Sequence, residues 1–103
     1  MITKASLDKA VSIIAESEAD GSTILLDGRN PSVPGYEQGN FLGPTIIDHA
    51  KPGMASYDLE IFAPVMTIVR VDTLAEAIKL VNAHPQGNGV AIFTKSGGAA
   101  RQF

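Results

Sequence analysis

PVMTIVRVDTLAEAIKLVNAHPQGNGVAIFT, residues 64–94, carries the patterns of a strand, a helix and a second strand in that order. Residues 64–71 are rich in β-branched side chains that alternate between two faces, and residues 90–94 are apolar at nearly every position, as in a fully buried strand. Between them, Thr73 and Glu76 have the spacing of a capping box that opens a helix. These lengths suit a right-handed βαβ crossover with two parallel strands, so the stretch predicts an α/β sheet with helices packed on it.

Further helices and strands are expected on both sides of this stretch. Residues 4–20 repeat apolar side chains with the period of an amphipathic helix, and Gly21 suits the left-handed position just after its end. Residues 23–27 and 41–48 predict two more strands, and Ser96 is placed to cap a last helix. The segments rich in glycine and proline predict loops, at residues 28–40 and 49–56.

Composition and charge exclude several classes of protein. With 103 residues, the chain is one domain at most or a piece of one. Its 8 basic and 11 acidic residues give a net charge of −3 and form no basic stripe, so we expect no nucleic-acid partner. No apolar run approaches the roughly 18 residues that cross a bilayer, so we expect no membrane association. Because the chain has no cysteine, it holds no disulfide, no thiolate metal site and no cysteine nucleophile.

Residues that carry chemistry are scarce. His49 and His84 stand alone in predicted loops, which favours solvated histidines over metal ligands, so no metal site is predicted.

The segment LEIFAPV, residues 59–65, is a stronger candidate for a binding site. Glu60 and Phe62 are two residues apart and would share one side of an extended chain. A carboxylate can accept from both hydroxyls of a ribose, and an aromatic ring can pack on a flat heterocycle. The spacing alone also fits an exposed glutamate beside a core phenylalanine, and both interpretations stay open.

The same segment resembles a known family. EIFAPV, residues 60–65, is similar to the Glu-x-Phe-Gly-Pro signature of the NAD(P)-dependent aldehyde dehydrogenases. Further stretches match that family in one register from Ile2 to Phe103, notably GNFLGPTI at 39–46, DTLAEAI at 72–78 and NAHPQGNGVAIFT at 82–94. Within the family, LDGRNP at 26–31 and the glycine-rich stretch before residue 94 look most like the branch that acts on methylmalonate semialdehyde and passes the acyl group to CoA. The sequence departs from the family pattern at Leu59, Ala63 and Gln86.

The resemblance implies a fold and a role for two residues. The chain, residues 1–103, would be one partial catalytic domain of an aldehyde dehydrogenase, with helices layered on a largely parallel sheet. The cofactor implied is NAD. Glu60 would bind the hydroxyls of the nicotinamide ribose, and Phe62 would contact that ribose and the nicotinamide. The family's usual glycine is Ala63 here. If the family needs a left-handed backbone or a close approach of the cofactor at that position, the extra methyl group would cost stability or distort the loop.

The resemblance also implies that catalysis needs more than these residues. The family's cysteine nucleophile and its Rossmann cofactor domain lie outside the matched stretch, so we expect no catalytic residue here, no turnover by the chain alone and at best weak NAD binding. CoA and the semialdehyde would then be ligands of the full-length protein only. The expected location is the cytoplasm, or the mitochondrial matrix in a eukaryote.

Two alternatives remain open at this stage. The chain could act alone as a self-associating or interaction module, because a partial sheet has unpaired edges and an uncovered apolar face. Its partner would be a second copy, joined through strands such as 65–71 or 90–94, or the remainder of the enzyme. The chain could also be an unrelated small ligand-binding α/β domain. In that case, changing Glu60 and Phe62 would leave ligand binding unaltered.

Overall fold

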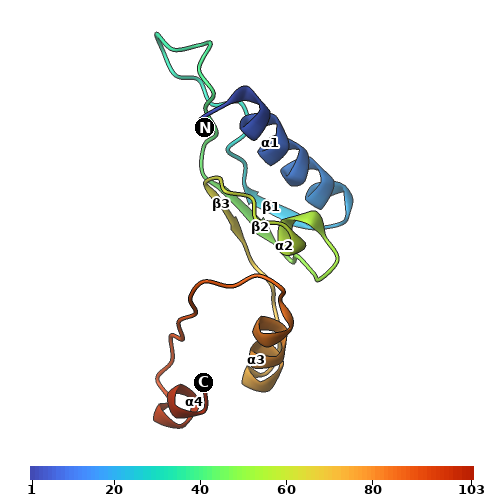
Figure 1. The fold of residues 1–103 in the computed structure, drawn as a ribbon, viewed down its shortest axis with the longest axis vertical. Helices are drawn as coiled ribbons and strands as arrows, with labels where there is room; N and C mark the ends of the chain where they lie inside the picture. Colours follow the sequence, from blue (N-terminus) through green and yellow to red (C-terminus); the bar gives the residue numbers. More distant parts are fainter. The chain divides into compact units, whose positions relative to one another are not determined.

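The computed structural model describes all 103 residues, which divide into two units, Met1–Arg70 and Val71–Phe103 (Figure 1). The elements run in the order α1 (Lys4–Ala19), β1 (Thr23–Leu26), β2 (Thr45–Asp48), α2 (Ala55–Asp58), β3 (Val65–Thr67), α3 (Leu74–Ala83) and α4 (Gly97–Gln102). None of the helices combines the length and the apolar run needed to cross a bilayer.

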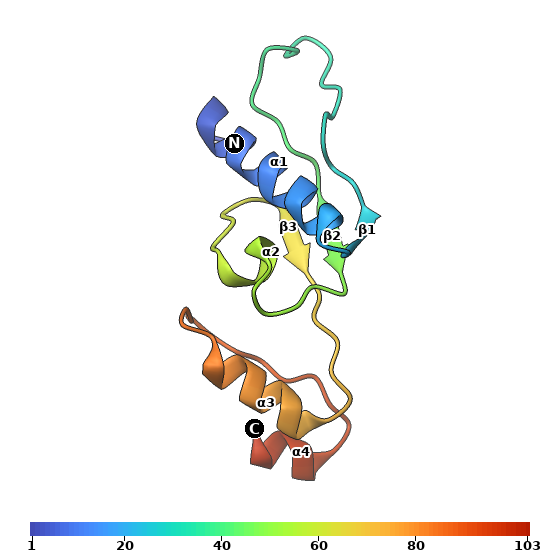
Figure 2. The ribbon, with the colours of Figure 1, turned by 90° about the vertical axis from the view of Figure 1, so that its right-hand side faces the viewer.

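Helix α1 begins and ends as the sequence predicts. The Thr3 side chain caps it by accepting from the backbone N–H of Ser6 at 3.1 Å, and Gly21 follows its end with a φ of +97°. That left-handed value costs a glycine little, because it has no Cβ. The inward side of α1 is fully buried and consists of Ala10, Ile13, Ile14 and Ser17. Figures 1 and 2 show α1 lying along one face of the sheet.

The sheet has three strands in the order β1-β2-β3, and its topology is mixed. β1 is antiparallel to β2, whereas β2 and β3 are parallel, with Thr45 opposite Val65 and Ile47 opposite Thr67. Thr45 and Ile47 of the central strand are fully buried, at 1% and 0% exposure. The α/β class is confirmed, and within this chain the parallel arrangement is limited to one pair of strands.

The predicted βαβ crossover is not completed within the chain. Residues 90–94 form no strand, and Val90 and Phe93 are 58% and 96% exposed. A strand exists only through ladder hydrogen bonds to a neighbour, and no other segment pairs with this one. β3 is also shorter than the predicted 64–71, although the Ile68 N–H still donates to Ile47 O at 2.8 Å. The one-turn helix α2 lies at the end of the predicted loop 49–56 and was not predicted.

The loop that follows β1 is closed by two glycines. The Gly43 N–H donates to Gly28 O at 2.8 Å, and the Gly28 N–H donates to Thr45 Oγ1 at 3.1 Å. A Cβ at Gly28 would lie only 2.0 Å from Gly43 O, so the two backbones can approach only because residue 28 has no side chain. The predicted loop 28–40 is confirmed. The chain leaves β1 and enters β2 side by side, where Gly28 contacts Gly43.

The second unit consists of α3, α4 and their connection. The capping box predicted at the start of α3 is present: Thr73 Oγ1 accepts from the Glu76 N–H, and the Glu76 carboxylate accepts from the Thr73 N–H. Ser96 caps α4 through the Ala99 N–H, also as predicted. No residue of α3 or α4 is fully buried. The starts of both helices are therefore stabilised by local N-caps. Their apolar sides are only half-covered.

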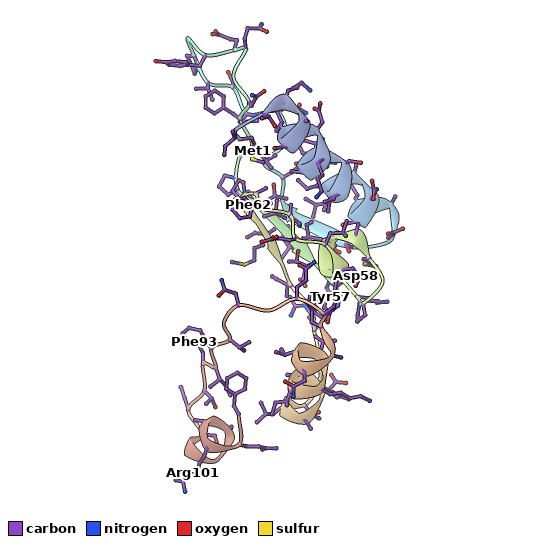
Figure 3. The ribbon with its side chains drawn as sticks, viewed as in Figure 1. Met1, Tyr57, Asp58, Phe62, Phe93 and Arg101 are labelled. Atoms are coloured by element: carbon purple, nitrogen blue, oxygen red, sulfur yellow. The ribbon has the colours of Figure 1, made fainter.

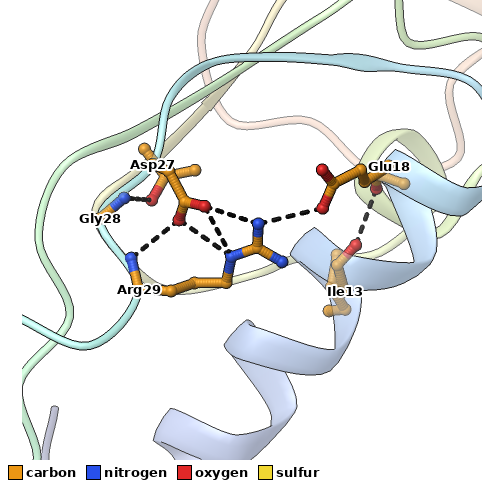
Figure 4. Close-up of polar contacts among 7 residues, drawn as sticks. Ile13, Glu18, Asp27, Gly28 and Arg29 are labelled. Atoms are coloured by element: carbon orange, nitrogen blue, oxygen red, sulfur yellow. Dashed lines mark hydrogen bonds and ion pairs between the residues drawn. The ribbon is translucent and has the colours of Figure 1, made fainter.

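An ion cluster ties the end of β1 to the last turns of α1 (Figure 4). The Arg29 guanidinium donates to both oxygens of Asp27, at 2.6–3.0 Å, and to Glu18 Oε2 at 3.0 Å. The Arg29 backbone N–H also donates to Asp27 Oδ1 at 3.0 Å. The side-chain hydrogen bonds, followed by the backbone one, lower the pKa of Asp27 from 3.8 to about 2. The same contacts raise the pKa of Arg29.

This cluster predicts a pH-dependent part of the stability. Because the folded-state pKa of Asp27 is depressed, its contribution is complete above the unfolded pKa of about 4 and is lost as the pH falls through about 2. We expect the urea midpoint to fall between pH 5 and pH 2, and Arg29→Met to remove part of that fall. Arg101→Met, in the other unit, is the matched control and should leave the slope unchanged. An unaltered slope in Arg29→Met would contradict the assignment.

Candidate functional site

Glu60 and Phe62 lie in the short segment that joins α2 to β3. The segment is anchored at its far end, because the Thr45 N–H of the central strand donates to Pro64 O at 2.9 Å. A tight turn is centred on that anchor, with the Val65 N–H donating to Ala63 O at 2.7 Å. The pairing of β2 with β3 therefore fixes where the segment enters the sheet.

The backbone at Phe62 is left-handed, with a φ of +49°. This conformation is uncommon for any residue other than glycine and costs roughly 1–2 kcal/mol. The Phe62 ring is 84% exposed, so it is not a core side chain (Figure 3). The extended chain expected through this motif is thus interrupted at Phe62, and the interpretation as a core phenylalanine is wrong.

Ala63 does not occupy the strained position. The residues other than glycine with a positive φ are Asn30, His49 and Phe62. The left-handed backbone on which strain from the extra methyl group depended is therefore absent at residue 63, and lies one residue earlier. Alanine at position 63 is compatible with the turn that leads into β3.

The two predicted residues line one hollow, and two residues of α1 join them. A hollow of about 240 Å³ is bordered by Ser6 and Lys9 from the first turns of α1 and by Glu60, Ile61 and Phe62. Within the chain, neither the Glu60 carboxylate nor the Lys9 ammonium makes a hydrogen bond or an ion pair. Both charged groups are therefore available to a ligand.

Sequence reasoning did not find Ser6 and Lys9. They lie more than fifty residues before Glu60, and on α1 they are ordinary exposed polar residues. Their only local signal is a spacing of three, which puts them on the same side of a helix. The larger hollow of about 420 Å³ lies elsewhere, between α1 and the loop after β1, and does not include Glu60 or Phe62.

The arrangement suits a ligand that has vicinal hydroxyls next to a flat ring. The Glu60 carboxylate can accept from two hydroxyls, and charge-assisted bonds of this kind are stronger than neutral ones. The exposed Phe62 ring offers a face for stacking. The Lys9 ammonium brings three donors to the other wall of the hollow.

The histidines contribute no metal site. His49 is exposed, with Nδ1 3.6 Å from Asp48 Oδ2, and His84 Nδ1 lies 3.1 Å from the donating N–H of Gln86. No group of three or more histidine, cysteine, aspartate or glutamate side chains could hold a metal ion. Asp48 itself is fully buried and is bound by the Arg70 guanidinium at 2.6 and 2.9 Å, which lowers its pKa.

Comparison with known proteins adds a family match that covers the whole chain. Residues 1–103 match the aldehyde dehydrogenase family. Over 103 residues the chain is 50% identical to the mitochondrial acylating methylmalonate-semialdehyde/malonate-semialdehyde dehydrogenase of Bos taurus, and 48% identical to that of Homo sapiens. Each match includes all of this chain and 19% of the relative.

Solved structures give the same result. The chain superposes on the methylmalonate-semialdehyde dehydrogenase DddC of Oceanimonas doudoroffii with a TM-score of 0.94 and 48% identity, over 100% of this chain and 21% of that one. A second structure, of a putative methylmalonate-semialdehyde dehydrogenase from Sinorhizobium meliloti complexed with NAD, gives a TM-score of 0.94 at 39% identity, over 99% of this chain and 21% of that one. The chain therefore spans about a fifth of the length of these relatives.

The left-handed backbone at Phe62 predicts opposite effects for two neighbouring substitutions. Phe62→Gly should raise the free energy of unfolding by about 1 kcal/mol, because it relieves the strain and removes a ring that is mostly in solvent. Ala63→Gly should lower it by about 0.4–1 kcal/mol, because residue 63 gains freedom only in the unfolded chain. Urea unfolding measures both. Destabilisation by Phe62→Gly equal to that by Ala63→Gly would rule out strain at residue 62.

Proposed function

The chain belongs to the aldehyde dehydrogenase family, and from that membership we propose that it is part of the catalytic domain of an NAD-dependent, CoA-acylating dehydrogenase of methylmalonate or malonate semialdehyde. The relatives named above support the substrate class, and the acylating activity in their names supports CoA as the acyl acceptor. The mitochondrial names of the eukaryotic relatives support a matrix location if the source is eukaryotic, and the cytoplasm is proposed otherwise. The alternative of an unrelated ligand-binding domain is wrong, since the family match covers the whole chain.

Within this function, the hollow beside α1 is proposed to hold the nicotinamide ribose of NAD. The observation that supports this most is the unpaired Glu60 carboxylate next to the exposed Phe62 ring. Glu60 would accept from the two ribose hydroxyls, and Phe62 would pack against the ribose and the ring attached to it. Lys9 and Ser6 would complete the opposite wall. NAD, when bound, supplies the hydride acceptor, and the residues here bind and orient it.

The chain alone is proposed to lack the chemical step. Oxidation of an aldehyde in this family needs a thiolate to form a covalent adduct, and the chain contains no cysteine. The hollow also offers contacts to only one end of a dinucleotide, so most of the binding free energy would come from the rest of the enzyme. The remainder of the dehydrogenase is therefore the proposed partner.

A second candidate is self-association of the chain without catalysis. The observation that favours it is the exposed apolar segment 90–94, in which the Phe93 ring is 96% exposed and labelled in Figure 3. A segment of strand-forming residues without a pairing partner can pair with a second copy. Sedimentation of the chain separates this candidate from the first, because a defined oligomer that is dissociated by Phe93→Lys would support it.

Binding of NAD to the chain tests the proposed site. In an NMR titration of the chain, NAD and nicotinamide riboside should both bind weakly and shift the backbone signals of Ser6, Lys9 and Glu60. Glu60→Gln should weaken binding about tenfold, because it removes a charged acceptor. Glu16→Gln is the matched control, since Glu16 is also exposed but lies away from the hollow. Equal affinities for the two variants would refute the assignment of Glu60.

A turnover assay tests the proposal that the chain alone cannot perform the chemical step. The chain, incubated with NAD, CoA and methylmalonate or malonate semialdehyde, should form no NADH above a protein-free blank, because no thiolate is present. Absorbance at the NADH maximum measures this directly. Formation of NADH in proportion to the protein concentration would show that the missing cysteine is not required.

A further inference from the structure

The connection between α3 and α4 contains an asparagine followed directly by a glycine. Asn88 and Gly89 are both exposed, and neither lies in a helix or a strand. The Asn88 side-chain amide and the Gly89 N–H make no hydrogen bond within the chain. A Cβ built on Gly89 would meet no atom within 4 Å, so nothing crowds the peptide group that joins the two residues. The amide carbon and the neighbouring backbone nitrogen are therefore both unrestrained.

Two such groups, adjacent in one chain, are set up for an intramolecular reaction. The Gly89 N–H gives its proton to a base in the solvent, and its nitrogen attacks Cγ of Asn88. The new N–Cγ bond closes a five-membered imide ring, the Cγ–Nδ2 bond breaks, and the amide nitrogen takes up a proton and leaves as ammonia. Water then adds to either carbonyl of the ring and breaks its C–N bond, which gives aspartate or isoaspartate. No group is oxidised or reduced.

The other three asparagines lack this freedom. Asn30 precedes Pro31, whose nitrogen has no proton to lose. Asn82 lies inside helix α3, where the regular backbone dihedrals hold the next N–H in the helix. Asn40 precedes Phe41, whose Cβ and ring crowd the attacking nitrogen.

Two aspartates also precede a glycine, and there the glycine N–H is engaged. The N–H that follows Asp20 donates to Glu18 O at 3.1 Å, and the N–H that follows Asp27 donates to Thr45 Oγ1 at 3.1 Å. The Asp27 carboxylate is also held by the ion cluster. Of the residues that can form an imide with a following glycine, Asn88 alone has both reacting groups free.

We infer that Asn88 is a site of spontaneous covalent modification, at which the chain converts to aspartate and isoaspartate forms. Each product adds one negative charge to a chain whose net charge is −3. The isoaspartate form also lengthens the main chain by one carbon, directly before the exposed apolar segment 90–94. The reaction needs only water as a co-reactant, so it depends neither on NAD nor on the remainder of the enzyme.

Peptide mapping of the incubated chain tests this site. After incubation at pH 8 and 37 °C, the tryptic peptide 80–95 should gain acid forms whose fragment ions place the change at Asn88. The aspartate and isoaspartate peptides should separate as two chromatographic peaks. Gly89→Ala should slow the conversion about tenfold, because its Cβ crowds and stiffens the attacking peptide group. Gly87→Ala is the matched control: it adds the same methyl group in equally open space before Asn88 and should react at the parent rate.

Three results would overturn the inference. They are an Asn88 that stays intact or converts more slowly than Asn40 or Asn82, conversion to aspartate without isoaspartate, and equal rates for Gly89→Ala and Gly87→Ala. The second result would indicate direct hydrolysis of the amide without an imide. Incubation in urea adds a measurement that needs no variant. Unfolding should speed conversion of Asn82, because α3 is lost, and should leave the rate at Asn88 unchanged; a rise at Asn88 would show that the folded chain protects it.

Discussion

The parallel pairing of β2 with β3 is the constraint on which the rest of the Met1–Arg70 unit depends. The central strand buries Thr45 and Ile47 against the α1 side, and its Thr45 N–H also holds Pro64 O at the start of β3. That second bond fixes the end of the segment that carries Glu60 and Phe62. Because the segment is anchored there, the strained backbone at Phe62 persists and the ring is held in solvent rather than buried.

The same pairing explains why the candidate site combines residues that are distant in the sequence. α1 packs on the sheet face beside β2, and its first turns bring Ser6 and Lys9 to the hollow that Glu60 and Phe62 line. The site therefore consists of an anchored loop and one helix. A helix and an anchored loop can hold a charged acceptor and a stacking ring in position before a ligand arrives, which lowers the entropy cost of binding.

Helices and most caps set by local chemistry were predicted from the sequence except for α2, whereas strands, which need a distant neighbour, were predicted only in part. The predicted caps at Thr73 and Ser96 depend on side chains within three residues of each helix start, and both are present. The helix α1 was also predicted, although its cap at Thr3 was not. Residues 90–94 have the composition of a buried strand, yet a strand needs a neighbour that composition does not reveal, so this prediction was wrong. The left-handed conformation of Phe62 likewise follows from its anchored surroundings.

The sequence likewise identified only those site residues that belong to a local motif. Glu60 and Phe62 were identified because they belong to a short family motif, whereas Ser6 and Lys9 had no signal beyond a helical spacing. The chain matches the aldehyde dehydrogenase family over its whole length and spans about a fifth of the length of its relatives.

Saturation-transfer NMR between the chain and NAD would test most directly which part of the cofactor meets this site. If Glu60 and Phe62 bind the nicotinamide ribose, saturation of the protein should transfer mainly to the protons of that ribose and of the nicotinamide. Transfer that is strongest to the adenine, or equal across the molecule, would contradict a nicotinamide site at the hollow beside α1.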